Sequence, residues 1–255
     1  MGVDLTVLDF LLKFRGKVHG NTLQLGKQGF HVGTSPGSNE REIANRVIRR
    51  YDPLMDVDQI AGSDGYTTKL FEYLGSNTVS SLDASSYEGA DIVHDLNMPI
   101  SDDYISRYDT IFDGGTIEHV FNLPIVFDNV KRMLKLGGLF LSVNAANNQL
   151  GHGFYQFSPE LMWRVFSKKA GFRVDLMQIA VVGDFENPVN IPDPADVGTR
   201  LEIGQTLGPA YILVAATKIG VDQDGYIPIQ SDYLTKWENG KKVGPGEYVP
   251  DTHGR

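Results

Sequence analysis

The sequence predicts an α/β fold, a doubly wound and mostly parallel β-sheet with helices on both faces. Short apolar runs typical of buried strands alternate with helix-length segments through the middle of the chain. The apolar run 108–113 ends in an acidic residue and two glycines, and a helix-length segment then leads to a second buried run at 138–143. Such a strand–helix–strand unit places polar residues at the edge where open α/β sheets bind ligands. The pattern therefore predicts a small-molecule site at that edge.

Hydrophobic spacing and glycine positions predict the elements of the N-terminal third. Apolar residues at helical spacing mark the helices, glycines mark where they end, and Pro53 breaks the pattern of one of them. In order, the expected elements are a helix over 3–15, a short strand within 21–29, a helical insertion or lid over 33–64 and a helix over 65–74.

The same reasoning predicts regular alternation in the rest of the chain. Pro124 and Pro159 suit the first turn of a helix, and Ser158 is a typical N-cap. The expected elements are strands at 79–83, 90–94 and 108–113, a helix over 124–135, a strand at 138–143, a helix from 159 to about 171, and strands at 173–182 and 210–219 separated by a loop over 183–209. We expect one domain over 1–219 and a tail over 220–255 that wraps the domain or is partly disordered.

Composition is that of a globular protein with a full core. The chain has 255 residues, of which 41% are hydrophobic and 22% are charged, and its formal net charge is -9. An acidic balance disfavours nucleic acid and anionic membranes as partners, because both attract clustered Lys and Arg. The composition therefore favours a small-molecule substrate, with no nucleic acid and no membrane as partner.

The chain contains no cysteine. Disulfides and thiolate metal sites are therefore excluded, and a reducing compartment is expected. We find no secretory signal pattern and no apolar run long enough to span a bilayer. These observations predict a cytoplasmic protein.

The order of elements resembles that of class I S-adenosylmethionine-dependent methyltransferases, over roughly residues 20–219. The matching segments are 81–83 as the acidic end of strand 2, 94–97 as the acidic–apolar pair after strand 3, 113–120 as the segment after strand 4 and 136–138 as the turn into strand 5. The resemblance implies a Rossmann-like methyltransferase domain over 1–219, with a C-terminal antiparallel strand pair. It also implies S-adenosylmethionine as the cofactor.

The resemblance assigns cofactor-binding residues at the edge of the sheet. Asp83 can accept from both ribose hydroxyls, Asp95 can accept from the adenine amino group, and Leu96 packs the ring. Gly114 and Gly115 leave room for the methionine end. The predicted cofactor-binding residues are Gly26, Lys27, Gln28, Asp83, Ala84, Asp95, Leu96, Asp113, Gly114, Gly115, Thr116 and His119.

Several of these residues also have a purely structural interpretation. Asp83 can form a turn or cap a helix, His119 can bond to backbone, and Glu118 can be an acid favoured at a helix start. The glycine loop departs from the family pattern, since residues 26–29 contain two glycines instead of three.

A second polar cluster follows the expected strand at 138–143. It runs over 144–158 and contains His152, flanked by glycines, and Tyr155. Histidine accepts protons near physiological pH, so we interpret His152 and Tyr155 as catalytic residues on the substrate side. The structural alternative is a loop in which Tyr155 packs and His152 bonds a carbonyl. The polar loop favours a small polar acceptor, such as a sugar or related metabolite.

The predicted activity is in-line methyl transfer, and two other functions stay open. A non-catalytic cofactor-binding or scaffold module would explain the reduced glycine loop. A nicotinamide-dependent oxidoreductase or epimerase would need a full Gly-x-Gly-x-x-Gly loop and commonly a Tyr-x-x-x-Lys pair, and neither is present. No metal is expected, because the histidines and acids around 94–95, 118–119 and 152 show no tight ligand spacing.

Overall fold

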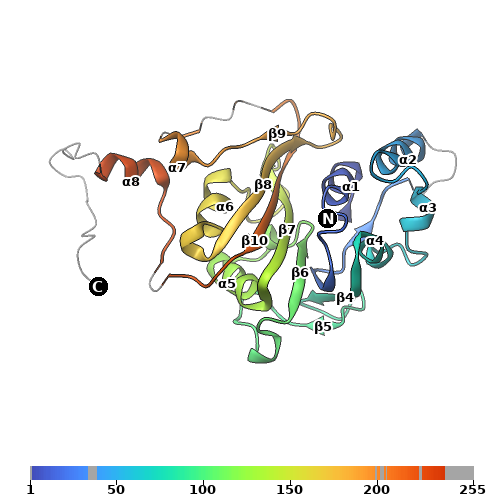
Figure 1. Ribbon diagram of the computed structural model, residues 1–255, viewed down its shortest axis with the longest axis horizontal. Helices are drawn as coiled ribbons and strands as arrows, with labels where there is room; N and C mark the ends of the chain where they lie inside the picture. Colours follow the sequence, from blue (N-terminus) through green and yellow to red (C-terminus); the bar gives the residue numbers. More distant parts are fainter. Residues whose placement is uncertain are drawn as a thin grey trace.

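A computed structural model describes residues 2–33, 39–198, 200–201, 204, 206–223 and 226–238. Within these residues the main sheet has eight strands (Figure 1). In spatial order they are β5 (Ile92–Val93), β4 (Ser76–Asp83), β2 (Gly20–Leu25), β6 (Tyr108–Asp113), β7 (Leu134–Asn147), β10 (Ala210–Lys218), β8 (Phe172–Val181) and β9 (Val189–Asn190).

The pairing of these strands confirms the predicted fold class. β5, β4, β2, β6 and β7 pair in parallel. β10 lies between β7 and β8 and is antiparallel to both, so the expected antiparallel pair is present. The chain winds outward from β2 to β5, returns to β6 beside β2, and winds outward in the other direction. This reversal is the doubly wound topology, and it puts the ends of β2 and β6 side by side.

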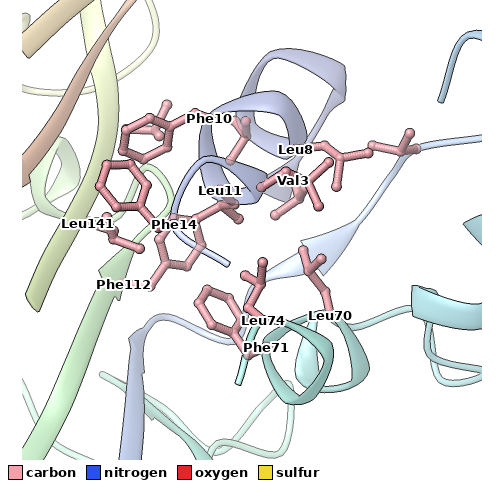
Figure 2. Close-up of a cluster of buried hydrophobic side chains, with 14 of the residues drawn as sticks. Val3, Leu8, Phe10, Leu11, Phe14, Leu70, Phe71, Leu74, Phe112 and Leu141 are labelled. Atoms are coloured by element: carbon pink, nitrogen blue, oxygen red, sulfur yellow. The ribbon is translucent and has the colours of Figure 1, made fainter. Parts of the chain in front are cut away.

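Helices cover both faces of the sheet (Figure 1). One face is covered by α1 (Leu5–Leu12), α2 (Asn39–Tyr51), α3 (Val57–Ile60) and α4 (Thr68–Leu74), and the other by α5 (Leu123–Met133) and α6 (Pro159–Val165). Successive side chains of β6 point to opposite faces of the sheet, so Phe112 packs in the core on the first face and Ile111 in the core on the second. Figure 2 shows Phe112 and Leu141 against the side chains of α1 and α4, and the Phe71 and Phe112 ring centroids are 5.1 Å apart.

Side chains at the helix starts explain several boundaries. The Asp4 carboxylate accepts from the Val7 backbone N–H at 2.9 Å and caps α1. The expected cap of α6 is present, because Ser158 accepts from the Leu161 N–H ahead of Pro159. β7 starts earlier than the expected strand at 138–143, because the chain enters it directly from the end of α5. It also ends later, because Ala145 and Asn147 still pair with β10.

Smaller elements complete the fold. The expected loop over 183–209 contains both β9 and a one-turn helix. The remaining elements are β1 (Gly2–Val3) and β3 (Gly29–Phe30), which pair in a separate sheet, α7 (Pro194–Val197), α8 (Ser231–Glu238), and the 3-10 turns η1 (Asp102–Tyr104), η2 (Ile117–His119) and η3 (Lys168–Ala170). No helix in the described part of the chain is both long and apolar enough to cross a membrane.

The segment 33–64 and the tail both pack on the domain where they are described. The insertion carries α2 and α3, whose side chains join the first core. In the tail, Tyr226 donates from its hydroxyl to the Arg164 carbonyl at 2.8 Å, and Ser231 donates from its backbone N–H to Glu160 at 2.7 Å. The expectation for residues 239–255 lies outside the described residues.

Candidate functional site

Three neighbouring parallel strands end together at the predicted edge. Leu25, at the end of β2, is in register with Leu82 of β4 on one side and with Asp113 of β6 on the other. Asp83 is paired with Val93 of β5, so the chain leading to Asp95 leaves the sheet at the same edge. Because the strands are parallel, segments far apart in the sequence meet there.

Gly26 allows the closest approach at this edge. Its φ of +72° is in the left-handed region. A Cβ on Gly26 would lie 2.7 Å from Thr116 Oγ1 and 3.8 Å from Asp83 Oδ2. The turn after β2 is therefore held against the turn after β6, with the Asp83 carboxylate beside it.

Gln28 fills space that the sequence interpretation left for a ligand. Its buried side chain donates from Nε2 to the Leu25 carbonyl at 2.6 Å and to Thr116 Oγ1 at 3.1 Å. A Cβ on Gly114 would lie 2.8 Å from Gln28 Oε1 and 2.9 Å from the Phe112 ring. A side chain at position 114 would therefore collide with these two side chains, and the expectation that Gly114 borders the methionine end stays a prediction. Gly115, with a φ of +89°, is required by the backbone of the turn.

The carboxylates of Asp83 and Asp95 both remain at the edge. Asp83 Oδ1 accepts from the Ser85 N–H at 3.2 Å, and Oδ2 has no hydrogen-bond partner within the described ranges. Asp95 is exposed, and hydrogen bonds from the backbone and side chain of Asn97 lower the pKa of Asp95. Ala84 is exposed beside Asp83.

Leu96 and Lys27, two of the predicted cofactor-binding residues, both contact other parts of the protein. Leu96 is only 4% exposed and packs in the second core, so most of its side chain contacts the protein interior. Lys27 donates from Nζ to the Gly89 carbonyl at 3.0 Å and lies over the Tyr66 ring. It therefore contacts the loop after β4.

Asp113 organises the turn from a fully buried position. Its Oδ1 accepts from the Thr116 N–H at 2.9 Å and the Ile117 N–H at 3.3 Å. Its Oδ2 accepts from Ser142 Oγ at 3.1 Å and Asn144 Nδ2 at 2.7 Å. Burial raises the pKa of Asp113. The carboxylate is engaged inside the protein, so it shapes the site and does not face a ligand.

Glu118, which the sequence interpretation assigned neither to cofactor binding nor to catalysis, lies beside the candidate site. Its side chain is fully buried, and Oε2 accepts from Asn144 Nδ2 at 3.1 Å. Oε1 has no hydrogen-bond partner within the described residues and lies 3.6 Å from His152 Nε2. Burial and the nearby charge of Asp113 raise the pKa of Glu118 to about 8. A polar Asn144 inside an otherwise buried strand was the sequence signal that could have indicated this partner.

The two predicted histidines meet above Glu118. The ring centroids of His119 and His152 are 5.1 Å apart. Burial, followed by the charge of His152, lowers the pKa of His119. Tyr155 holds the loop after β7, which carries His152, against the segment that carries His119. Its hydroxyl donates to the Phe121 carbonyl at 2.8 Å, and its N–H donates to the Glu118 carbonyl at 3.2 Å. The Tyr155 hydroxyl is thus engaged with backbone.

Two cavities lie away from this edge. The larger, about 520 Å³, is lined by residues of α6 and η3 together with Tyr226 and Leu234. The other, about 240 Å³, is lined by Ser158, Glu160 and Arg200 among others. Neither includes a residue predicted from the sequence to bind the cofactor.

No family model and no curated protein match this sequence. The fold is similar to that of solved methyltransferases. The S-adenosylmethionine-dependent methyltransferase from Mesorhizobium loti is 15% identical, with a TM-score of 0.45 over 81% of this chain and 95% of that chain. The N-methyltransferase NodS from Bradyrhizobium japonicum, in complex with S-adenosyl-L-homocysteine, is 10% identical, with a TM-score of 0.44 over 84% of this chain and 88% of that chain. At these values the similarity assigns no role to any residue of this chain.

Proposed function

We propose that this protein is an S-adenosylmethionine-dependent methyltransferase that acts on a small polar acceptor, such as a sugar or related metabolite. The domain proposed to carry the activity spans 1–219. The observation that carries the proposal is the meeting of the Gly26 turn and the Asp83 carboxylate at the carboxyl edge of parallel strands. In doubly wound folds this edge binds nucleosides, with a strand-terminal acid on the ribose hydroxyls.

The residues at this edge fit an adenosyl group. Asp83 Oδ2 lacks a partner among the described residues and can accept a ribose hydroxyl. Gly26 brings the turn after β2 close to this carboxylate. Asp95 is exposed and can accept from the adenine amino group. Gln28, Asp113 and Thr116 support the site by holding the two turns together.

When bound, S-adenosylmethionine supplies an activated methyl group, so the chain's own contribution is orientation and the exclusion of water. His152 is the proton acceptor of the proposal. Its imidazole is partly exposed, and it can take the proton that an acceptor hydroxyl or ammonium loses. Tyr155 holds the loop that carries His152 against the backbone of Glu118.

Calorimetry on the full chain tests cofactor binding. We expect S-adenosylmethionine or S-adenosyl-L-homocysteine to bind with a micromolar Kd, about -8 kcal/mol. Asp83→Asn should weaken binding at least about tenfold, because a charge-assisted acceptor worth roughly 1.5–3 kcal/mol is lost. Asp103→Asn is the matched control, since Asp103 is exposed and lies in η1, before β6 begins. Absence of heat with either ligand, or equal loss in both variants, contradicts the proposal.

Turnover separates an enzyme from a binding module. Methyl incorporation would be measured over a panel of hydroxylated and amino metabolites. His152→Ala should lower kcat by about 10²–10⁴-fold with cofactor affinity unchanged, as expected for loss of a proton acceptor. Cofactor binding without turnover over the panel would instead support the non-catalytic module.

A further inference from the structure

A cluster of one carboxylate and two imidazoles lies beside the proposed cofactor site. Glu118 and His119 belong to η2, directly after the β6 turn, and His152 belongs to the loop after β7. One oxygen of Glu118 and one ring nitrogen of each histidine all lie within 4.8 Å of one another. The sequence predicted no such group, because His152 is far from the other two residues along the chain.

Backbone contacts hold the two segments together. The Glu118 carbonyl accepts from the Phe154 N–H at 2.9 Å and the Tyr155 N–H at 3.2 Å. Gly153 permits this contact, since a Cβ there would lie 2.9 Å from the Glu118 carbonyl oxygen and 3.1 Å from His119 Nδ1. The cluster is therefore a consequence of fixed main-chain contacts and not of side chains meeting by chance on an open surface.

One buried oxygen of Glu118 is available as a cation ligand. Glu118 is fully buried, Oε1 has no hydrogen-bond partner among the described residues, and its 3.6 Å separation from His152 Nε2 is too long for a hydrogen bond. Buried carboxylate oxygens are costly without a partner. In the described ranges, neither Glu118 nor the nearby Asp113 forms an ion pair with Lys or Arg. A cation bound at Oε1 would supply the partner that this oxygen lacks.

A hydrogen bond from Asn144 also orients the Glu118 carboxylate as a metal ligand would need to be oriented. Asn144 Nδ2 donates to Glu118 Oε2 at 3.1 Å and to Asp113 Oδ2 at 2.7 Å. Hydrogen bonds of this kind orient metal-binding carboxylates and leave the other oxygen to the metal. The hydrogen bonds from Asn144 to Asp113 and Glu118 fix Glu118 Oε2, so that Glu118 Oε1 faces the histidines.

We propose that Glu118 Oε1 and one ring nitrogen each of His119 and His152 bind a divalent transition-metal ion. Two imidazoles and a carboxylate suit Zn²⁺, Fe²⁺, Mn²⁺ or Co²⁺ better than Mg²⁺ or Ca²⁺, which prefer oxygen ligands. Tetrahedral zinc bonds of about 2.0–2.1 Å place ligand atoms roughly 3.3–3.5 Å apart, so the partly exposed imidazoles must move inward on binding. Three protein ligands leave a position open for water or for a hydroxyl of the acceptor.

The catalytic role of the ion rests on the proposed function, whereas its binding does not. A bound divalent ion lowers the pKa of its water to about 7 and would lower the pKa of an acceptor hydroxyl in the same way. The hydroxyl proton would pass to solvent, the oxygen would take the methyl group from the sulfonium, and S-adenosyl-L-homocysteine would leave as a neutral thioether. His152 would then act as a ligand in place of a free base. Activity that needs the ion would distinguish this arrangement from catalysis by the imidazole alone.

Metal binding is tested on the full, tag-free chain after removal of metals with a chelator. Zn²⁺ would be titrated by calorimetry, and Co²⁺ by its visible absorption, without any cofactor. We expect one ion per chain, bound at least about 100-fold more tightly than Mg²⁺. His119→Ala, His152→Ala and Glu118→Gln should each weaken Zn²⁺ binding at least about tenfold, and Asn144→Ala should do so by about 10–100-fold through loss of ligand orientation.

His19→Ala is the matched control, because His19 is exposed and directly precedes β2, whereas the cluster follows β6 and β7. It should bind Zn²⁺ like the parent chain. His152→Ala alters only an exposed loop residue, so the test stands even if Glu118→Gln fails to fold. Absence of Zn²⁺ and Co²⁺ binding, or binding that survives loss of both histidines, overturns the metal site. Cofactor binding by the chelator-treated chain is measured separately, so failure of the proposed function is distinguishable.

Discussion

Single residues at the site act mainly by joining segments of backbone. Thr116 Oγ1 donates to the Leu25 carbonyl at 2.7 Å, and Gln28 Nε2 donates to the same carbonyl at 2.6 Å. Asp113 accepts from the backbone of its own turn. Side-chain bonds to backbone leave few buried groups unpaired at a strand end, where the sheet no longer supplies partners. The turns are thereby rigid before any ligand binds.

Gly26→Ala should destabilise the fold more than Gly16→Ala. Both glycines have positive φ, so both variants carry a backbone cost of about 1–2 kcal/mol. At Gly16 a Cβ would meet nothing within 4 Å, whereas at Gly26 it would lie 2.7 Å from Thr116 Oγ1. The added clash should cost roughly 1–3 kcal/mol more. Urea denaturation of both variants measures the difference, and equal free energies of unfolding would show that the two turns are not in contact.

Asp109 should stabilise the fold in a pH-dependent way. Its carboxylate is partly buried, which opposes ionisation, but hydrogen bonds and charge from Lys135 and a hydrogen bond from the Asn21 N–H lower the pKa of Asp109 overall. A lowered pKa in the folded state gives stability that is present above the unfolded value of 3.8 and is lost as pH falls through the folded pKa.

Asp109→Asn should therefore lower the free energy of unfolding at pH 7 by about 1.5–3 kcal/mol. The deficit should shrink as the pH falls below 3.8, measured as urea midpoints from pH 7 to pH 3. Asp103→Asn, at an exposed carboxylate, should change stability by less than about 0.5 kcal/mol. A deficit that stays constant over this pH range would contradict the role of charge.

Among the elements, α5 positions the loop that carries Asp95. Asn129 of α5 is fully buried, accepts from the Ile100 N–H at 2.8 Å and donates to the Met98 carbonyl at 2.8 Å. The loop after β5 has no strand partner over these residues, so a helix side chain supplies the hydrogen bonds that a sheet would otherwise give. The position of the Asp95 loop thus depends on α5, a helix that follows β6 and therefore comes later in the chain than the loop.

Asn129→Ala should destabilise the fold by about 2–4 kcal/mol, because buried backbone groups of the loop lose their partners. It should also weaken cofactor binding, through displacement of Asp95. Asp128→Ala is a suitable control on the same helix, since Asp128 is exposed. Thermal denaturation and calorimetry measure the two effects. Full cofactor affinity in the Asn129 variant would mean that Asp95 is not needed for binding.

Over the whole molecule, two separate cores lock the sheet between its helix layers. The first core joins α1 and α4 to Phe112 and Leu141 (Figure 2). The second core joins α5 and α6 to Ile111. The sheet is therefore rigid, and the site at its edge is built on strand ends that are anchored from both faces. A ligand at that edge should stabilise the native state as a unit.

S-adenosyl-L-homocysteine at 100 times its Kd should raise the free energy of unfolding by about 2.7 kcal/mol. For a chain of this size the expected increase in Tm is roughly 5–10 °C. Differential scanning fluorimetry measures the shift, and nicotinamide cofactors at the same concentration should produce none. A larger shift with NAD than with S-adenosyl-L-homocysteine would favour the oxidoreductase alternative.

Local patterns in the chain were sufficient to identify the layers of the fold and the edge at which the candidate residues lie. Strand and helix periods, the proline at 159 and the glycine at 26 act within a few residues, so the long strands of the sheet and the helices that cover it could be predicted without knowledge of their neighbours. The short elements β1, β3, β9 and α7 were not predicted. The apolar run 108–113 matches β6 residue for residue for the same reason.

Contacts between distant segments could not be predicted this way. Burial of Leu96, the filling of the space beside Gly114 by Gln28, and the meeting of Glu118 with His152 all depend on which strands are neighbours and in what register. A buried carboxylate with one free oxygen is visible only once packing has removed water from it. Tertiary packing therefore decided which of the candidate side chains are exposed at the edge and which are buried and hold the edge together.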